Sequence, residues 1–298
     1  MRDTVAVLGP GAVGGALAAH LANAGVHVVC IPRPETVQVL ALAGITVEVE
    51  SREPIVARPE VAGELTRPVA LLLVTVKAYQ LEEALSHVDP AAVEEGVVVP
   101  LLNGLEHLDA LEARFGARVA AGSISRFEAY RAGRFQIIQK TPSAVVTMAA
   151  RDLSLELEHA AALLQRGALE VRLEEDERQV LWRKAGRLAV LAAATTASAL
   201  PVGPLRDDPR WRERLEDAIE EACAIAAADG VALSSATQWR IIEDLDDDLT
   251  TSTARDVAAG RPSELDAITG SVVRAGERLG VSCPALSELY AEAKARAR

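Results

Sequence analysis

Thr4-Val-Ala-Val-Leu8 runs directly into Gly9-Pro-Gly-Ala-Val-Gly14, and an Ala- and Leu-rich segment continues from there to Gly25. The apolar run predicts a strand, the Gly-x-Gly-x-x-Gly spacing predicts a tight turn, and the segment behind it predicts a helix. A second strand is predicted at His27–Ile31. Together these elements form a βαβ unit, which is typical of domains that bind a dinucleotide.

Each glycine of the turn has a separate expected role. We expect Gly9 to permit the tight turn, Gly11 to let the backbone approach a pyrophosphate, and Gly14 to let the helix pack closely on the strand. The amides and the dipole of the helix N-terminus would face the phosphates. A structural βα turn without a ligand is the alternative. The cofactor-binding residues predicted here are Gly9, Pro10, Gly11, Ala12, Val13 and Gly14.

The end of the second predicted strand indicates which dinucleotide is bound. An NAD pocket usually has Asp or Glu at this point, where the carboxylate accepts hydrogen bonds from the ribose. This chain instead has Cys30-Ile-Pro-Arg-Pro34, and its first acid is Glu35. The planar fork of Arg33 would pair with a 2′-phosphate, so the pattern favours NADP. The alternative is that Arg33 is an exposed loop arginine in an arginine-rich chain.

Length, charge and cysteine content narrow the class of protein. The chain has 298 residues, of which 50 % are hydrophobic, so it can bury the cores of two domains. Its net charge of −12 argues against nucleic acid or an anionic membrane as a partner. Cys30, Cys223 and Cys283 have no disulfide or zinc spacing and predict core thiols in a reducing compartment. The longest apolar run, Leu188–Leu200, is too short to span a bilayer, so a cytoplasmic location is expected.

The first part of the chain alternates strands with helices. Val69–Val76 and Val97–Leu102 are continuous apolar runs of the kind that parallel strands covered on both faces have, and a helix is predicted near Leu81–Ser86. This alternation predicts an α/β fold, with a Rossmann-type doubly wound sheet in a dinucleotide-binding domain of residues 1–173.

The second part of the chain has the periodicity of helices alone. Examples are Arg210–Ala228, followed by Asp229-Gly230, and Ser263–Leu279, followed by Gly280. We therefore predict an all-α domain for substrate and catalysis over residues 174–298. The boundary lies in an acidic stretch without a flexible linker, so the two domains are expected to pack directly, with a cleft between them.

Lysine is rare in this chain and marks candidate catalytic positions. Of 31 basic residues only four are lysines, and unlike arginine a lysine gives up its proton at accessible pH when its pKa is lowered. Lys184 shares the apolar stripe of its predicted helix with Leu181 and Leu188. It is a candidate general acid that donates a proton to a carbonyl oxygen as hydride reaches the carbon. The alternative is a lysine whose stem packs on the core while its amine reaches water.

Two further polar residues follow predicted sheet strands. Lys77 closes the strand Val69–Val76, and Asn103 follows Val97–Leu102 in a turn completed by Gly104. Both would therefore lie at the carboxyl edge of the sheet, where doubly wound folds bind their ligands. For each residue alone, a strand-end charge or a simple turn explains the position equally well.

Glu264 lies at a predicted helix start, after Arg261-Pro-Ser263. Ser263 is expected to cap this helix, and an acid in the first turn is also explained by the helix dipole. The five histidines have no metal-ligand spacing, so no metal site is expected. His107 follows Asn103 closely enough to line the cleft, although an exposed first-turn residue is the preferred interpretation.

These residues together resemble the 2-dehydropantoate 2-reductase family, also called ketopantoate reductases, over nearly the whole chain. The matching segments are Gly9-Pro-Gly-Ala-Val-Gly14, Val76-Lys77-Ala-Tyr-Gln80, Asn103-Gly104-Leu105, Leu181-Trp-Arg-Lys184, Ser252, Asp256 and Arg261-Pro-Ser-Glu-Leu-Asp266.

The resemblance implies a role for each matching residue. The glycines would bind NADP, and Lys77 and Asn103 would contact the cofactor, with Asn103 also contacting substrate. Lys184 would be the proton donor and bind substrate. Ser252 would contact substrate, and Glu264 would organise the cofactor and the active site. The implied reaction is the NADPH-dependent reduction of a 2-oxo acid, with 2-dehydropantoate giving pantoate in pantothenate biosynthesis.

The chain departs from the family pattern at two positions. The family has asparagines four and eight residues after its catalytic lysine, whereas this chain has Leu188 and Ala192. A site that loses such hydrogen-bonding groups loses selectivity for a hydroxylated substrate. The residues that could replace these contacts are Arg187, Thr195, Thr196 and Ser198.

Two alternatives therefore stay open for the function. One is a related reductase of another carbonyl or imine, and the other is an NADP-binding sensor without catalysis. The expected partner is a small-molecule substrate rather than nucleic acid or a membrane. The oligomeric state is open, with a homodimer as one option.

Overall fold

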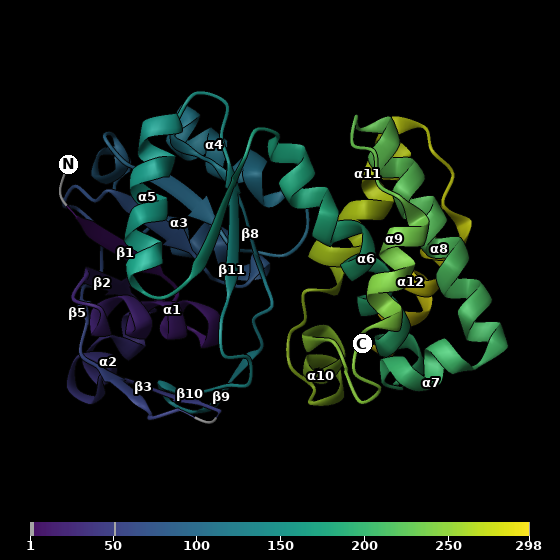
Figure 1. The fold of residues 1–298 in the computed structure, drawn as a ribbon, viewed down its shortest axis with the longest axis horizontal. Helices are drawn as coiled ribbons and strands as arrows, with labels where there is room; N and C mark the ends of the chain where they lie inside the picture. The colour runs from purple at the N-terminus through teal and green to yellow at the C-terminus, as the bar shows by residue number, and fades with distance from the viewer. Residues whose placement is uncertain (1–2, 51, 298) are drawn as a thin grey trace. The chain divides into compact units, whose positions relative to one another are not determined.

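The structure is a computed structural model that describes residues 3–50 and 52–297 and shows two compact units (Figure 1). The first unit consists of Met1–Leu102 and His107–Val180. The second consists of Asn103–Glu106 and Leu181–Arg298. The short loop Asn103–Glu106 thus belongs with the helical unit although its neighbours in sequence belong to the first. The domain boundary expected between residues 173 and 174 stays a prediction.

A five-stranded parallel sheet forms the centre of the first unit. Its strands lie in the order β5-β2-β1-β6-β7. Their bounds are Thr4–Leu8 for β1, His27–Ile31 for β2, Glu60–Val61 for β5, Leu71–Val74 for β6 and Val97–Pro100 for β7. All four residues of β6 and all four of β7 are buried, as continuous apolar runs predict.

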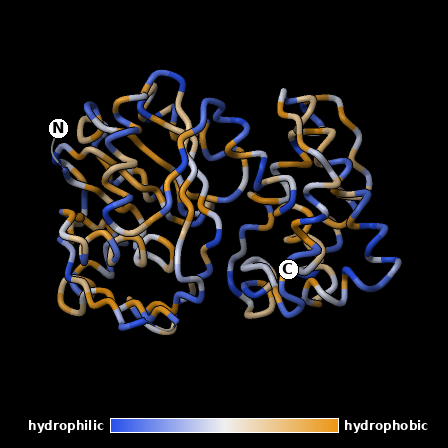
Figure 2. The backbone as a smooth tube through the Cα atoms, viewed as in Figure 1, coloured by the Kyte–Doolittle hydropathy of each residue, from blue (hydrophilic) through white to orange (hydrophobic). Residues whose placement is uncertain are grey.

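Helices cover both faces of this sheet. Val5 and Val7 point into a core shared with α1 (Ala12–Asn23) and α5 (Ser154–Arg166). Ala6 and Leu8 point into the opposite core, which contains apolar residues of α3 (Leu81–Leu85) and α4 (His107–Phe115). Figure 2 shows the hydrophobic stretches of this unit running through its interior. The doubly wound α/β fold predicted from the sequence is confirmed.

The remaining helical segments of the first unit are short. They are η1 (Pro34–Thr36), α2 (Val37–Ala43), η2 (Ala78–Gln80), η3 (Pro90–Val93) and η4 (Gly116–Arg118).

Two smaller sheets complete this unit, and the sequence analysis did not predict them. One has the order β4-β3-β10-β9 and the other β12-β11-β8. The bounds are β3 Ile45–Val49, β4 Ile55–Ala57, β8 Ala121–Ser125, β9 Ala129–Gly133, β10 Gln136–Gln139, β11 Val145–Ala149 and β12 Glu170–Glu174. The simple alternation of strand and helix is interrupted twice, because no α-helix separates β3 to β6 or β8 to β11. Because β10 pairs with β3, far away in sequence, and no residue of β9 is fully buried, local periodicity gave little signal for either strand.

The second unit is built from helices, as predicted. They are α6 (Glu177–Ser198), α7 (Val202–Asp207), α8 (Pro209–Ala228), α9 (Ser235–Glu243), α10 (Ser252–Ala258), η5 (Asp266–Gly270), α11 (Ser271–Leu279) and α12 (Pro284–Arg296). Among the described residues, no helix is long and apolar enough to cross a membrane.

Trp182 of α6 is the largest fully buried side chain in the described part of the chain. Its indole Nε1 donates a 2.7 Å hydrogen bond to Oδ2 of Asp229, at the end of α8. A buried indole N–H needs such a partner, so this bond fixes α6 against α8.

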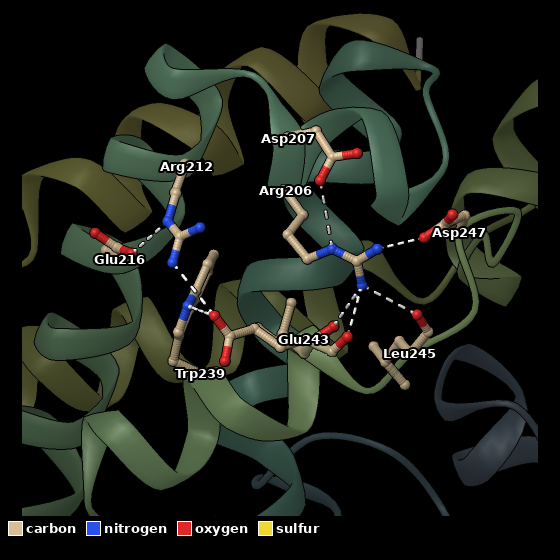
Figure 3. Close-up of polar contacts among 9 residues, drawn as sticks. Arg206, Asp207, Arg212, Glu216, Trp239, Glu243, Leu245 and Asp247 are labelled. Carbon is tan, nitrogen blue, oxygen red and sulfur yellow. Dashed lines mark hydrogen bonds and ion pairs between the residues drawn. The ribbon is translucent and has the colours of Figure 1, made fainter.

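Arg206 of α7 ties another helix end into the unit (Figure 3). Its Nη1 lies 2.8 Å from the carbonyl oxygen of Glu243, the last residue of α9, and 3.1 Å from that of Leu245. Its Nη2 also pairs with Asp247. A cation that satisfies the carbonyls at a helix C-terminus also interacts favourably with the helix dipole.

The helix predicted over Ser263–Leu279 differs from the structure at its start. Ser263 does not cap it, since the first helical residue is Leu265 and a π-helical turn follows over Asp266–Gly270 before α11. A Cβ on Gly270 would lie 2.8 Å from the hydroxyl of Tyr290, so glycine lets this side chain pack closely on the wide turn. The predicted end at Gly280 is confirmed, with φ at +70°.

Candidate active site

The glycine turn after β1 has the geometry that its spacing predicts. Gly9 has φ at +84°, and its amide donates a 3.0 Å hydrogen bond to the carbonyl of Ile31. Its own carbonyl accepts hydrogen bonds from the amide of Gly11, at 2.6 Å, and from Oγ1 of Thr75, at 2.9 Å. A Cβ on Gly9 would lie 2.4 Å from Cγ1 of Val76. The turn is therefore held between the end of β2 and the residues that follow β6.

Gly14 and Gly11 are glycines for different reasons. A Cβ on Gly14 would lie 2.0 Å from Oγ1 of Thr75 and 2.7 Å from the carbonyl of Gly9. A Cβ on Gly11 would meet only that same carbonyl, at 3.9 Å. Protein packing thus requires glycine at position 14 but not at position 11. Open space above Gly11 fits a ligand that approaches the backbone closely.

The N-terminus of α1 is also suited to an anion. Gly11 is the capping residue, no side chain hydrogen-bonds to the cap, and no acidic residue lies in the first turn. The free amides and the positive end of the helix dipole then have no protein anion to compete for them. Pro10, Ala12 and Val13 surround this end of the helix. The residues present fit the pyrophosphate of a dinucleotide.

Arg33 follows β2 as the residue before η1. Its side chain is 58 % exposed, and Nε lies 3.3 Å from Oε1 of Glu35. An exposed pair at this distance is weak and screened by solvent, so the guanidinium keeps most of its capacity to bind another anion.

Lys77 and Asn103 follow neighbouring strands. β6 and β7 pair in parallel, with Leu71 opposite Val97, so the chain leaves both strands at the same edge of the sheet. Lys77 is half-buried directly before η2. Asn103 is half-buried as well and belongs to the helical unit.

The loop that carries Asn103 is fixed to the π-helical turn and α11. Gly104 has φ at +94°, and a Cβ on it would lie 2.0 Å from the carbonyl oxygen of Ala267. Glu106 accepts a bidentate pair of hydrogen bonds from Arg274, at 2.8 Å from Nε and 2.7 Å from Nη2. The hydrogen bond with Glu106 raises the pKa of Arg274 above its ordinary value. Sequence reasoning missed Glu106 and Arg274, since their contact joins positions far apart in the chain.

Asp266, in the same turn, completes this ionic group. Its Oδ1 accepts a hydrogen bond from the Tyr290 hydroxyl and another from Arg274 at 3.3 Å. The bond from Tyr290 is the main cause that lowers the pKa of Asp266. Burial, and then Asp266 itself, raises the pKa of Tyr290 to about 12.

Lys184 and Glu264 form the chemically distinctive pair of the helical unit. Glu264 is only 5 % exposed and directly precedes Leu265, the first helical residue before the π-helical turn. Burial is the main cause that lowers the pKa of Lys184 from about 10.5 to about 8, while Glu264 acts to raise it and Arg187 to lower it. An amine with this pKa gives up a proton near neutral pH, as a general acid requires.

Ser252 is exposed at the first turn of α10. The helix start behind it is fixed, because Oγ1 of the capping Thr251 lies 2.9 Å from Oγ1 of Thr195 on α6. After α10, Arg261 donates hydrogen bonds of 3.0 and 2.8 Å to Oδ1 of Asp256. This pair closes the turn that leads to Glu264.

The positions that follow Lys184 at one-turn intervals are apolar. Leu188 is half-buried and Ala192 is fully buried. Of the hydroxyls named as replacements, that of Thr195 bonds to the carbonyl of Leu191, and that of Ser198 bonds to Ala194 in the same way.

Thr196 is the third hydroxyl named as a replacement. Its side chain is only 2 % exposed, so its hydroxyl does not reach solvent. Its Oγ1 has no hydrogen-bond partner among the described residues, whereas the hydroxyls of Thr195 and Ser198 are occupied, so Thr196 and Arg187 are the replacements that remain.

The exposure of His107 and of the three cysteines tests two further predictions from the sequence. His107 is 6 % exposed, so the interpretation as an exposed first-turn residue is wrong, because its side chain turns into the unit from the start of α4. Cys30, Cys223 and Cys283 are all buried, as predicted for core thiols. Burial raises the pKa of Cys30 to about 12, so its thiol is inert at neutral pH.

Comparisons with known proteins match both halves of the chain. The family model "Ketopantoate reductase PanE/ApbA" matches residues 5–152, and "Ketopantoate reductase PanE/ApbA C terminal" matches residues 176–297. The 2-dehydropantoate 2-reductase of Caulobacter vibrioides is 30 % identical over 289 residues, which cover 95 % of each chain.

Solved structures share the fold over nearly the full length. A PanE/ApbA family ketopantoate reductase from Ralstonia eutropha superposes with a TM-score of 0.88 and 28 % identity, covering 99 % of this chain and 98 % of that one. A D-mandelate dehydrogenase in complex with NADH and anilino(oxo)acetate superposes with a TM-score of 0.89 over the same shares, at 21 % identity. The latter similarity concerns the fold alone.

Proposed function

This chain belongs to the ketopantoate reductase family, and we propose that it uses NADPH to reduce the carbonyl of a 2-oxo acid to a 2-hydroxy acid. Family membership makes it an oxidoreductase that acts on a carbonyl or alcohol group with a nicotinamide cofactor. The specific cofactor contacts, the acid–base residues and the substrate are argued below as parts of the proposal.

The cofactor would be held by the glycine turn and by Arg33. Gly11 leaves room for the pyrophosphate, and the amides at the start of α1 face it. Arg33, at the end of β2, would pair with the 2′-phosphate that distinguishes NADPH from NADH. Lys77 and Asn103 would contact the nicotinamide half from the carboxyl edge of the sheet.

Lys184 would act as the general acid. Bound NADPH supplies a hydride to the carbonyl carbon, and the electron pair of the C=O bond moves to the oxygen. The ammonium of Lys184 donates its proton to that oxygen, which becomes the hydroxyl of the product. A pKa of about 8 supports this role, because the amine is mostly protonated at neutral pH and releases its proton readily.

Glu264, Asn103 and Ser252 would position the reactants. The buried carboxylate of Glu264 raises the pKa of Lys184 and so opposes the effect of burial. Asn103 is held on its loop by Gly104 and by the Glu106 contact, which gives its amide a defined place for hydrogen bonding to substrate. Ser252 offers an exposed hydroxyl to the substrate.

Two substrate classes are candidates. The first is 2-dehydropantoate, the substrate in the name of the Caulobacter relative, whose reduction serves pantothenate biosynthesis. The second is a 2-oxo acid with an apolar side chain, which Leu188 and Ala192 favour because neither can bind a hydroxyl. Trimethylpyruvate separates the two, since it lacks only the hydroxyl of 2-dehydropantoate.

The observation that carries the proposal is the lowered pKa of Lys184 beside buried Glu264. The test is a measurement of NADPH oxidation by the purified protein with a panel of 2-oxo acids that includes both of these compounds. Turnover with at least one 2-oxo acid is expected, with kcat/KM for trimethylpyruvate at or above that for 2-dehydropantoate. Tight NADPH binding without turnover on any member of the panel would favour the sensor.

A further inference from the structure

Arg187 lies next to Lys184 on α6. Residues three apart on a helix are neighbours, with Cβ atoms about 5–6 Å apart. Their charges interact, because Arg187 contributes to the lowered pKa of Lys184. Arg187 is itself half-buried, and burial lowers the pKa of its guanidinium. Two cations thus lie side by side in a partly desolvated environment, where Glu264 supplies one negative charge against the two positive ones.

The guanidinium of Arg187 is oriented by neutral groups. Its Nη1 donates a 2.7 Å hydrogen bond to Oε1 of Gln238 on α9, and a 3.3 Å bond to the carbonyl of Arg183. Gln238 is only 5 % exposed, so a buried amide fixes the direction of the fork. Among residues 3–50 and 52–297, Arg187 takes part in no ion pair. By contrast, Arg206 and Arg274 each pair with a carboxylate.

The edge of the fork formed by Nε and Nη2 is the part of Arg187 left for a ligand. Both described hydrogen bonds of this guanidinium use Nη1. Arginine has five N–H donors, and paired N–H groups along one edge match the two oxygens of a carboxylate. The structure therefore presents an oriented carboxylate-binding edge one helical turn from the amine of Lys184.

We propose that Arg187 binds the carboxylate of the substrate. This inference rests on the proposed function and deepens it. In a 2-oxo acid the carboxylate carbon is bonded directly to the carbonyl carbon, so its binding group must lie beside the group that protonates the carbonyl oxygen. Arg187 and Lys184 have that spacing. The arriving carboxylate offsets the cost of two neighbouring cations.

The neighbouring side chains define the rest of the substrate class. Leu188 follows Arg187 on α6 and lies one turn after Lys184, where it offers an apolar surface. The hydroxyls of Thr195 and Ser198 are engaged within the helix, and that of Thr196 is buried, so the surface that adjoins Arg187 in sequence is the apolar one of Leu188. The preferred ligand is a monocarboxylic 2-oxo acid with an apolar side chain.

The test compares Arg187→Met with Arg183→Met, which removes an exposed arginine one turn earlier on the same helix. The rate of NADPH oxidation is measured with trimethylpyruvate and with its amide, in which a neutral carboxamide replaces the carboxylate. For Arg187→Met, KM for the acid should rise by about ten- to a hundredfold, the loss expected for a bidentate charge-assisted contact. Its KM for the amide should stay near that of the unmutated protein, and Arg183→Met should change neither KM.

A second measurement does not depend on turnover. Calorimetric binding of oxamate to the NADP-loaded protein should weaken by the same factor in Arg187→Met. Gln238→Glu tests the idea without truncating Arg187, because the new carboxylate would pair with the guanidinium. It should also raise KM for the acid but not for the amide, so the proposal stays testable even where Arg187→Met does not fold.

The outcomes separate this inference from the proposed function. If the unmutated protein reduces no 2-oxo acid and binds no oxamate, the proposed function fails. If it reduces 2-oxo acids and both variants keep the original KM, the proposed function stands and the role of Arg187 is wrong. Equal increases in KM for acid and amide would mean that Arg187 acts through packing rather than through charge.

Discussion

The glycine turn of the α/β unit and the surroundings of Lys184 in the helical unit are built in opposite ways. Residues 9–14 are shaped by backbone geometry, with Gly9 at positive φ and Gly14 packed against Thr75. Around Lys184, by contrast, side chains from separate elements create the chemistry, with buried Glu264 raising its pKa and Arg187 lowering it. The phosphate binding that we propose for the first region needs only its own backbone, while the chemistry proposed for the second depends on how distant segments pack.

This contrast predicts that substitutions in the helical unit change the rate, whereas substitutions in the turn change cofactor affinity or folding. The largest effect is expected at Lys184. Lys184→Ala should lower kcat by about 10²–10⁴-fold, the usual contribution of a general acid, and leave the Kd for NADPH nearly unchanged. Steady-state kinetics and fluorescence titration of NADPH measure the two quantities.

Lys184→Arg tests whether proton donation, rather than positive charge, is what Lys184 supplies. Guanidinium keeps its charge but does not release a proton at accessible pH, so this variant should recover little activity. Lys140→Ala, at an exposed position after β10, is the control and should have full activity. A Lys184→Arg protein with near-normal kcat would mean that the lysine only packs its stem on the core.

The next largest effect separates two glycines of the same turn. In Gly14→Ala the new methyl would collide with Thr75 and with the Gly9 carbonyl, so the free energy of unfolding should fall by about 1–3 kcal/mol or more. In Gly11→Ala it should change by less than about 1 kcal/mol, since the methyl meets nothing closer than 3.9 Å. Urea denaturation provides both values.

Cofactor affinity should respond to Gly11→Ala even though stability does not. The methyl occupies the space where the pyrophosphate approaches the backbone, and we expect the Kd for NADPH to rise by about tenfold or more. Unchanged NADPH binding in a stable Gly11→Ala protein would show that the turn is a structural connection and that the cofactor lies elsewhere.

The same contrast explains how much the sequence could predict. The parallel sheet, the turn and the candidate residues Lys184 and Glu264 follow from local patterns and motifs, because strand burial and glycine geometry leave a trace within a few residues. Other features depend on partners or packing distant in sequence. They are the pairing of β10 with β3, the bidentate hydrogen bond from Arg274 to Glu106, and the burial of His107. The late start of the helix after Ser263 belongs to the same group, since Asp266 in its π-helical turn bonds to Tyr290 of α12.

A smaller effect is expected from Arg33, which belongs to the α/β unit but acts through its side chain. Arg33→Ala should weaken NADPH binding by about ten- to a hundredfold, the value of one bidentate charge-assisted contact, and leave NADH binding nearly unchanged. Arg52→Ala, a second exposed arginine of this unit, is the control. Equal affinities of the unmutated protein for NADPH and NADH would contradict the assignment of Arg33 to the 2′-phosphate.

The smallest effect, but the most diagnostic, is the pH dependence. The proton donor must be protonated, so kcat should fall to half near pH 8 and to about one tenth near pH 9. With the ordinary lysine pKa near 10.5, kcat would instead stay nearly constant up to about pH 9.5. The stability should change in the opposite direction. Between pH 8 and pH 10.5 the unfolded chain binds more protons at Lys184 than the folded one, so the free energy of unfolding should rise with pH in this window. Lys184→Met should remove that rise, and denaturation midpoints of the two proteins across the window measure it. A rate that stays level to pH 10 would show that Lys184 titrates as an ordinary exposed lysine, and the chemistry assigned to the helical unit would then need another donor.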